Sequence, residues 1–186
     1  MRFPLLDRLG LPCVFERLVP GQQHPDGRRY LPQIVLRPTG RADELPAGLL
    51  LGVVDRHHRV AEGDAGRAGS ARLVCALSGL RLQPLPGRLG LRPEPGWRGG
   101  VSTRPLILGR VVEVAAWEAE RGRLPYETLY TELSLDIGLG VIGLRTSLTA
   151  DSLSGALGKA RVEPGDYVEL ARSRIDILGF APGATV

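Results

Sequence analysis

Lysine is almost absent from this chain of 186 residues, because Lys159 is the only lysine among 24 basic residues. A GC-rich genome favours arginine codons over lysine codons and would produce this bias by itself. Arginine also has its own chemistry, since its planar guanidinium binds phosphate through two hydrogen bonds and stacks on bases. Composition alone supports both explanations.

Cysteine is also scarce, and the sequence has no long apolar stretch of the kind that enters a membrane. Cys13 and Cys75 stand apart, with no CxxC motif and no histidine at metal-ligand spacing, which is typical of buried thiols in a reducing compartment. Asp7 and Arg8 interrupt the apolar start that a signal peptide needs. The longest apolar runs, such as 49–54, are too short to span a bilayer. We therefore expect a cytoplasmic protein with no membrane partner.

Catalytic, metal-binding and cofactor-binding signatures are missing as well. The serines and cysteines lack a nucleophile-elbow motif. The glycine clusters at 63–69 and 96–100 lack the lysine of a P-loop. His57 and His58 point apart on an extended chain and lie between two arginines, which disfavours a bound cation. We expect a non-enzymatic protein without cofactor or metal, although dispersed carboxylates would leave no local signature.

Charge is unevenly distributed along the chain. Residues 1–104 hold sixteen arginines against nine acidic residues, a net charge of +7. Residues 105–186 hold eight basic residues against eleven acidic ones, a net charge of −3. Such asymmetry indicates a polyanionic partner for the basic part.

Short strands joined by tight turns are predicted along most of the chain. The 25 glycines and 15 prolines suit such turns. Period-two alternation or apolar runs mark the expected strands, which are 30–36, 49–54, 71–77, 79–85, 89–92, 106–117, 129–137, 141–148, 167–170 and 173–180. A short helix is expected over 152–157, and the segment 93–100 breaks the pattern. We therefore predict two domains, 1–100 and 101–186.

Three motifs of the C-terminal half resemble those of OB-fold (oligonucleotide/oligosaccharide-binding) domains. They are an opening strand Leu108-Gly-Arg-Val-Val-Glu-Val, a hairpin Asp136-Ile-Gly-Leu-Gly-Val-Ile-Gly-Leu, and a turn into a strand Val162-Glu-Pro-Gly-Asp-Tyr-Val-Glu-Leu. The order of strand, hairpin, short helix and final strands matches as well. The resemblance implies a mostly β protein with a small closed barrel in the C-terminal half. The β-rich N-terminal half allows a second small barrel, since 49–55 is similar to 106–113.

The resemblance also implies a binding surface on the outward face of the predicted barrel. By alternation this face carries Glu113, Trp117, Tyr130, Glu132, Ser134, Asp136, Arg145 and Tyr167. On this interpretation Trp117, Tyr130 and Tyr167 stack on bases and Arg145 contacts phosphate. The alternative is that the aromatic side chains cap the barrel or pack on the N-terminal half, and the nearby carboxylates would repel a phosphate backbone.

Arginines of the N-terminal half offer a second set of phosphate contacts. Several lie in predicted loops, where they would follow a phosphate chain with salt-dependent affinity; the set includes Arg28, Arg29, Arg56, Arg59 and Arg72. The alternative is a solvated arginine-rich surface. The leading hypothesis is a protein that binds single-stranded DNA or RNA. The competing hypothesis is a structural or adaptor module that contacts a protein partner or a second copy of itself.

Overall fold

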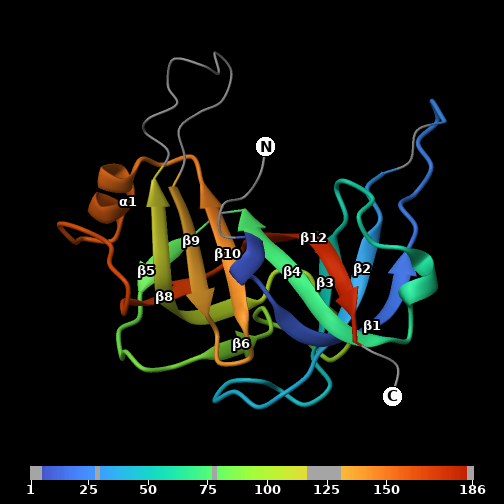
Figure 1. Cartoon of the computed structure of the whole chain (residues 1–186), viewed down its shortest axis with the longest axis horizontal. Coiled ribbons are helices and arrows are strands. Elements are labelled where there is room, and N and C mark those ends of the chain that lie inside the picture. The colour runs from blue at the N-terminus through green and yellow to red at the C-terminus, as the bar shows by residue number, and fades with distance from the viewer. Residues whose placement is uncertain (1–5, 28–29, 77–78, 117–130, 184–186) are drawn as a thin grey trace.

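The computed structural model describes residues 6–27, 30–76, 79–116 and 131–183, and it consists mostly of β-strands (Figure 1). The strands are β1 (Leu11–Val19), β2 (Gln33–Pro38), β3 (Leu50–Val54), β4 (Ala68–Ala76), β5 (Leu80–Leu82), β6 (Gly90–Arg92), β7 (Val101–Ser102), β8 (Leu106–Ala116), β9 (Thr131–Asp136), β10 (Val141–Thr146), β11 (Tyr167–Leu170) and β12 (Arg174–Pro182). The helical elements are α1 (Ala150–Ala156) and the 3-10 turns η1 (Leu6–Arg8) and η2 (Glu62–Asp64). The predicted mostly β fold is confirmed.

Five strands form a closed barrel on the right of Figure 1. Antiparallel ladders join β1 to β2, β2 to β3, β12 to β4, and β4 back to β1. The ring closes where β3 meets β12 in parallel, with Val54 opposite Asp176. A closed ring leaves no unpaired strand edge. A small closed barrel is thus present. The sequence predicted one in the C-terminal half and allowed a second in the N-terminal half, and this ring takes four of its five strands from the N-terminal half.

The closed ring draws its strands from both parts of the chain. β1 to β4 come from the N-terminal part, whereas β12 is the last strand of the sequence. The sequence analysis expected this last strand to complete the C-terminal set. It instead pairs along almost its whole length with β4, because Ile175 and Ile177 are needed inside the N-terminal ring, where both are buried.

The other strands form a second group on the left of Figure 1, in the order β10, β9, β8, β11, β5. The predicted succession of strand, hairpin, short helix and strand appears here as β8, β9–β10, α1 and β11. β10 also pairs in parallel with the end of β4, which attaches this second strand group to the barrel. The β4–β12 ladder continues into the β5–β11 ladder, bridged where the Ala171 N–H donates to the Gly79 carbonyl at 3.0 Å.

One hydrophobic core runs through both strand groups. Inward residues alternate with outward ones along each strand, so that Phe15 and Leu73 fill the barrel while Leu133 and Leu144 fill the second group. Burial of these side chains stabilises the fold by about 25 cal/mol per Å² of apolar area removed from water. The single core joins the two groups into one packed unit.

The outward face of β9 is also buried, which corrects part of the sequence prediction. Glu132 and Ser134 were expected away from the core, yet both are fully buried. By strand register their face also carries Val74, which packs with Leu9 in a second, smaller apolar cluster. The alternation of β9 was therefore a correct indication of a strand but a wrong indication of solvent exposure.

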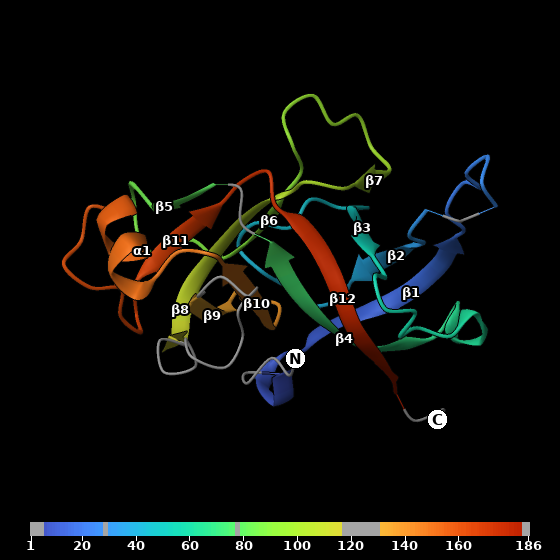
Figure 2. The same ribbon diagram turned by 90° about the horizontal axis from the view of Figure 1, so that it is seen from above.

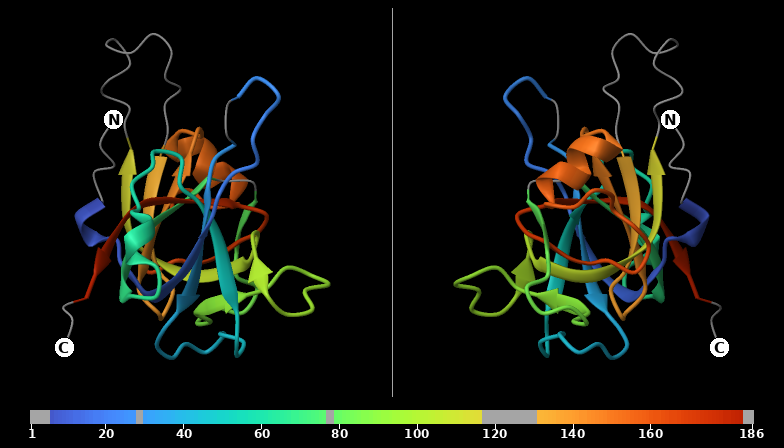
Figure 3. Two further views of the ribbon diagram at one scale, coloured as in Figure 1. Left: turned by 90° about the vertical axis from the view of Figure 1, so that its right-hand side faces the viewer. Right: turned by 90° about the vertical axis from the view of Figure 1, so that its left-hand side faces the viewer.

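Two connections project from this body. The connection between β1 and β2 extends from one end of the molecule, and the connection before β7 extends from its side (Figures 2 and 3). α1 packs at the opposite end, beside the second strand group (Figure 2). The junction between the two strand groups, where β4 changes partners, lies between these extremes.

Candidate anion-binding pocket

A pocket of about 790 Å³ lies at the junction of the barrel and the second strand group. Its lining comes from the connection after β3, from the ends of β4 and β10, from the segment that follows β10, from β12, from α1 and from the start of β5. The volume falls within the range of about 300–1,000 Å³ that is usual for small-molecule sites. No single element contains this site, because separate parts of the chain meet there.

Two arginines flank a small side chain on one wall of the pocket. Ala76 of β4 is paired with Arg145 of β10 on one side and with Arg174 of β12 on the other. Directly paired residues share a face of the sheet, and adjacent strands lie about 4.8 Å apart, so the two arginine backbones are about 10 Å apart across β4. Because Ala76 carries only a methyl group, its side chain does not fill the space between the two guanidiniums.

Carboxylates hold both guanidiniums in place. Nε and Nη2 of Arg145 donate to Oε1 of the buried Glu132, at 3.1 and 2.8 Å. Nε and Nη2 of Arg174 donate to the two carboxylate oxygens of Asp176, at 2.7 and 2.9 Å. Charge-assisted pairs of this kind fix the plane of the guanidinium as well as its position.

Arg56 joins the same group from the connection after β3. Its Nε lies 3.6 Å from Oδ2 of Asp176, so Asp176 serves two arginines. Three guanidiniums and two carboxylates leave a local net charge of +1. Guanidiniums in a partly enclosed pocket interact more strongly with an anion than they would in open solvent.

A buried aspartate shapes the turn that presents Arg56 and His57 to the pocket. The Asp55 carboxylate is 1% exposed and accepts hydrogen bonds from the backbone N–H groups of Arg59 and Val60, at 2.9 and 3.0 Å. Side-chain capping of this kind replaces a backbone turn hydrogen bond. Asp55 thus has a structural role, and it sets the position of the two residues that follow it.

The remaining wall of the pocket is largely apolar. It is formed by Leu80, by Leu148, and by Leu153 and Leu157 from α1 and its C-cap. α1 begins at Ala150, because the Thr149 side chain accepts a hydrogen bond from the Ser152 N–H. The pocket therefore combines a cationic side with an apolar side.

Cys75 lies in the pocket lining but does not supply a nucleophile. It is fully buried, and burial raises the pKa of its thiol to about 12, with the Asp176 charge adding to the effect. The thiol is therefore protonated at neutral pH, whereas thiol nucleophiles react as thiolates. Cys75 acts here as a small core side chain.

The structure brings several of the sequence-predicted residues together. Arg56 and Arg145, which are 89 positions apart, line the same pocket. Arg72 is exposed on β4, two residues before Val74, so alternation places it on the same face of that strand as the pocket wall. Arg59 is exposed in the turn after Arg56 but does not line the pocket.

Other predicted residues lie elsewhere. Tyr167 is half-buried on β11, opposite Arg110 of β8, and does not line the pocket, so the structure does not bring it together with Arg145. Trp117, Tyr130, Arg28 and Arg29 lie outside the described residues. The expected row of stacking aromatic residues beside Arg145 is therefore not seen in the part of the chain that the structure describes.

Sequence reasoning missed Arg174 and the importance of Ala76. The alternation Arg174-Ile-Asp176 does place two opposite charges on one face of a strand, which was a usable signal. The pairing of Ala76 with both arginines has no local signature, because it depends on the change of partners at the end of β4.

Within residues 6–27, 30–76, 79–116 and 131–183, no group of three or more histidine, cysteine, aspartate or glutamate side chains is placed to hold a metal ion. No helix in this part of the chain is long and apolar enough to cross a membrane.

Comparison of the chain with protein-family models, curated proteins and solved structures found no significant match. Function therefore has to be inferred from the chemistry of the pocket and of the charged surface.

Proposed function

We propose that this protein is a non-enzymatic binder of single-stranded nucleic acid and that the pocket is the centre of its binding surface. The observation that carries this proposal is the convergence of Arg56, Arg145 and Arg174 from three separate parts of the chain onto one pocket. Arginine is well suited to phosphate, because its guanidinium presents a planar set of donors. A cytoplasmic location fits the two free, buried cysteines.

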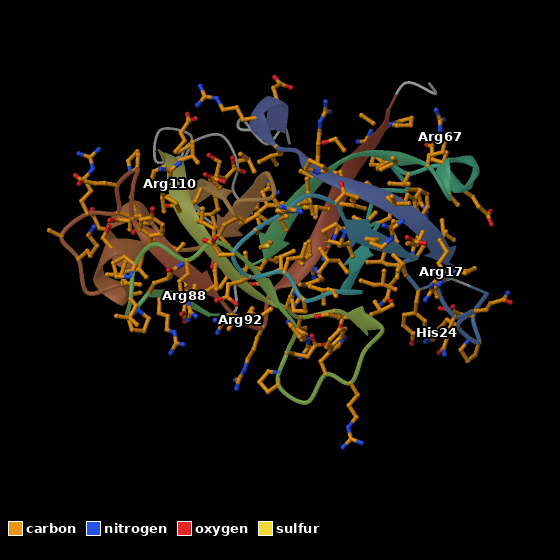
Figure 4. All side chains as sticks on the ribbon, turned by 90° about the horizontal axis from the view of Figure 1, so that it is seen from below. Arg17, His24, Arg67, Arg88, Arg92 and Arg110 are labelled. Atoms are coloured by element: carbon orange, nitrogen blue, oxygen red, sulfur yellow. The ribbon has the colours of Figure 1, made fainter. Side chains whose placement is uncertain are left out.

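Arginines outside the pocket extend the basic surface. Six described arginines before Pro105 make no ion pair with a carboxylate of the described residues; they are Arg17, Arg41, Arg59, Arg72, Arg98 and Arg104. Figure 4 shows one of them, Arg17, far from the ion-paired Arg88 and Arg110. A polyanion gains the most binding free energy from arginines that have no carboxylate partner.

Fluorescence anisotropy with labelled single-stranded DNA and RNA tests the proposal. We expect micromolar or tighter binding at low salt, which weakens as salt rises because phosphate contacts release counterions. The variant Arg56→Gln with Arg72→Gln should weaken binding about tenfold or more, since it removes two contacts beside the pocket. The matched control is Arg81→Gln with Arg161→Gln, because it also removes two arginines but neither lines the pocket, and it should change binding little.

Failure to bind either nucleic acid at low salt would refute the proposal. Equal weakening by the control variant would show that only overall charge matters and would remove the pocket from the binding surface. Circular dichroism and thermal unfolding of each variant separate a loss of binding from a loss of fold.

A second candidate function is self-association, and the projecting connection between β1 and β2 favours it. Val19, Tyr30 and Leu31 are 40%, 58% and 42% exposed there. Val19 and Tyr30 border one shallow hollow, so part of this apolar surface is continuous. Exposed apolar patches of this kind mark contact surfaces more often than scattered apolar residues do.

Light scattering of the purified protein separates the two candidates. A stable dimer that Tyr30→Ser with Leu31→Ser converts to a monomer, with no response to nucleic acid, would favour self-association. A monomer that binds oligonucleotides would favour the first candidate.

A further inference from the structure

We propose that the pocket binds a terminal phosphate monoester of a nucleotide, so that the protein recognises the phosphorylated end of a strand. This inference rests on the proposed function, because it assigns to the pocket one particular part of the nucleic acid. The same chemistry is carried by a free nucleoside monophosphate, which serves below as a separate probe.

The placement of the arginines favours a terminal phosphate over one inside a strand. Arg145 and Arg174 approach from opposite sides of Ala76, and Arg56 approaches from the connection after β3. A monoester carries about −1.5 to −2 charges near neutral pH and three terminal oxygens, whereas an internal diester carries one charge. Guanidiniums on two sides of one space therefore gain more from a monoester.

The apolar wall suits the rest of the terminal nucleotide. Leu148, Leu153 and Leu157 face the same space as the arginines. A volume of about 790 Å³ leaves room for a base and a sugar beside the phosphate.

Glu132 acts as a positioning residue for Arg145. A carboxylate with no exposed surface is costly to desolvate, and a well-packed apolar residue at this site would often be as stable or more so. Its one described effect on the pocket is to hold Nε and Nη2 of Arg145 at 3.1 and 2.8 Å. A buried charge that fixes a half-exposed guanidinium is expected where the direction of that guanidinium matters for binding.

The test compares oligonucleotides of one sequence that carry a 5′-phosphate, a 3′-phosphate or no phosphate. We expect one phosphorylated end to bind about tenfold more tightly than the unphosphorylated strand. A nucleoside monophosphate should compete with the phosphorylated end for the pocket and remove its advantage in affinity, and inorganic phosphate should compete more weakly. Arg174→Gln should lower the affinity for the phosphorylated strand by more than it lowers the affinity for the unphosphorylated strand, and so abolish the preference. Arg161→Gln should preserve both affinities.

The outcomes separate the two proposals. Equal binding of all three strands, without binding of the monophosphate, overturns the terminal-phosphate site and leaves the proposed function standing. Binding of the monophosphate without binding of any strand supports the pocket and overturns the proposed function. An equal loss of affinity for all strands in Arg174→Gln, with the fold intact, assigns Arg174 to the general phosphate contacts and overturns its role in end recognition.

Discussion

Arginines in the two parts of the chain are neutralised to different extents. Among the described residues after Pro105, Arg110, Arg145 and Arg174 each pair with a carboxylate, and Arg145 pairs with one that is fully buried. Before Pro105, six described arginines have no such partner among the described residues, and the pairs that do form are partly or largely exposed, as in Arg37–Glu16. Arg110, Arg145 and Arg174 are held in position, whereas many N-terminal arginines present their charge to solvent.

This difference gives the two sets separate roles. A guanidinium fixed by a carboxylate has a defined direction but a reduced net charge, which suits selective contact with one group. An unpaired guanidinium contributes long-range attraction that salt screens. At the pocket an arginine of the basic part, Arg56, lies near Arg145 and Arg174 of the acidic part.

The largest expected effect is on the free energy of unfolding. It is seen by comparing a variant that breaks the buried Arg145–Glu132 pair with one that breaks the exposed Arg37–Glu16 pair. Arg145→Met leaves the buried Glu132 carboxylate without its guanidinium partner and should lower the free energy of unfolding by about 3 kcal/mol. Arg37→Met breaks the exposed pair with Glu16 and should cost about 0.5 kcal/mol or less. Urea unfolding at neutral pH measures both.

A second substitution tests the cause of that loss. Combining Arg145→Met with Glu132→Gln removes the stranded charge and should recover part of the stability. If the two single variants lose equal stability, or if the double variant is no better than Arg145→Met, the contrast between buried and exposed pairs is wrong.

The next effect is a loss of stability at alkaline pH, and it arises in the barrel and not in the second strand group. Both cysteines lie in barrel strands, and burial raises the pKa of Cys13 to about 11 and that of Cys75 to about 12, from an ordinary value of 9. Above pH 9 the thiols ionise in the unfolded chain but stay protonated in the folded one. Stability should therefore fall by about 1.4 kcal/mol per pH unit for each thiol until its folded pKa is reached.

Urea unfolding between pH 8 and 11 checks this sign. Cys75→Ala should lower the stability at pH 8, because it leaves a small cavity, and should also make the dependence on pH shallower. A variant with the same pH dependence as the parent protein would show that ionisation of Cys75 is not the cause.

A smaller effect separates unpaired from paired arginines in nucleic-acid binding. Arg72→Gln removes a charge with no described carboxylate partner and should reduce the slope of log K against log salt by about 0.7, the value for one contact to a single strand. Arg81→Gln, whose arginine pairs with Glu169 at 2.5 Å, should leave the slope nearly unchanged. Salt titrations of anisotropy measure both slopes, and equal changes would contradict the comparison.

The smallest effect is expected at the pair of arginines that share Glu44. The hydrogen bond from Arg92 lowers the pKa of the Glu44 carboxyl, and the charges of Arg92 and Arg88 act in the same direction. The stabilisation is present above the ordinary pKa and is lost as pH falls through the lowered value. Because the pair is partly exposed, Glu44→Gln should cost less than about 1 kcal/mol at pH 7 and nothing near pH 2, as measured by urea unfolding. A cost that persists at pH 2 would show that Glu44 stabilises by packing and not by its charge.

The sequence by itself determined the elements and the charge. Apolar runs and period-two alternation predicted the strands other than β1 and β7, because the pleat of a strand turns successive side chains to opposite faces. The count of arginines against acids fixed the polarity of the two halves. The likeness to OB-fold domains stays a prediction.

Only the tertiary structure decided which strands close the barrel and where the arginines meet. β12 joins β3 and β4 through pairings that lie about a hundred residues or more apart in sequence, and such ladders leave no local pattern. The burial of Glu132 has no local signature either, because the alternation of β9 places it on the outward face. The Arg145–Ala76–Arg174 arrangement exists because β4 pairs with β10 and β12 at the same residue, so the site is a property of the junction and not of any segment.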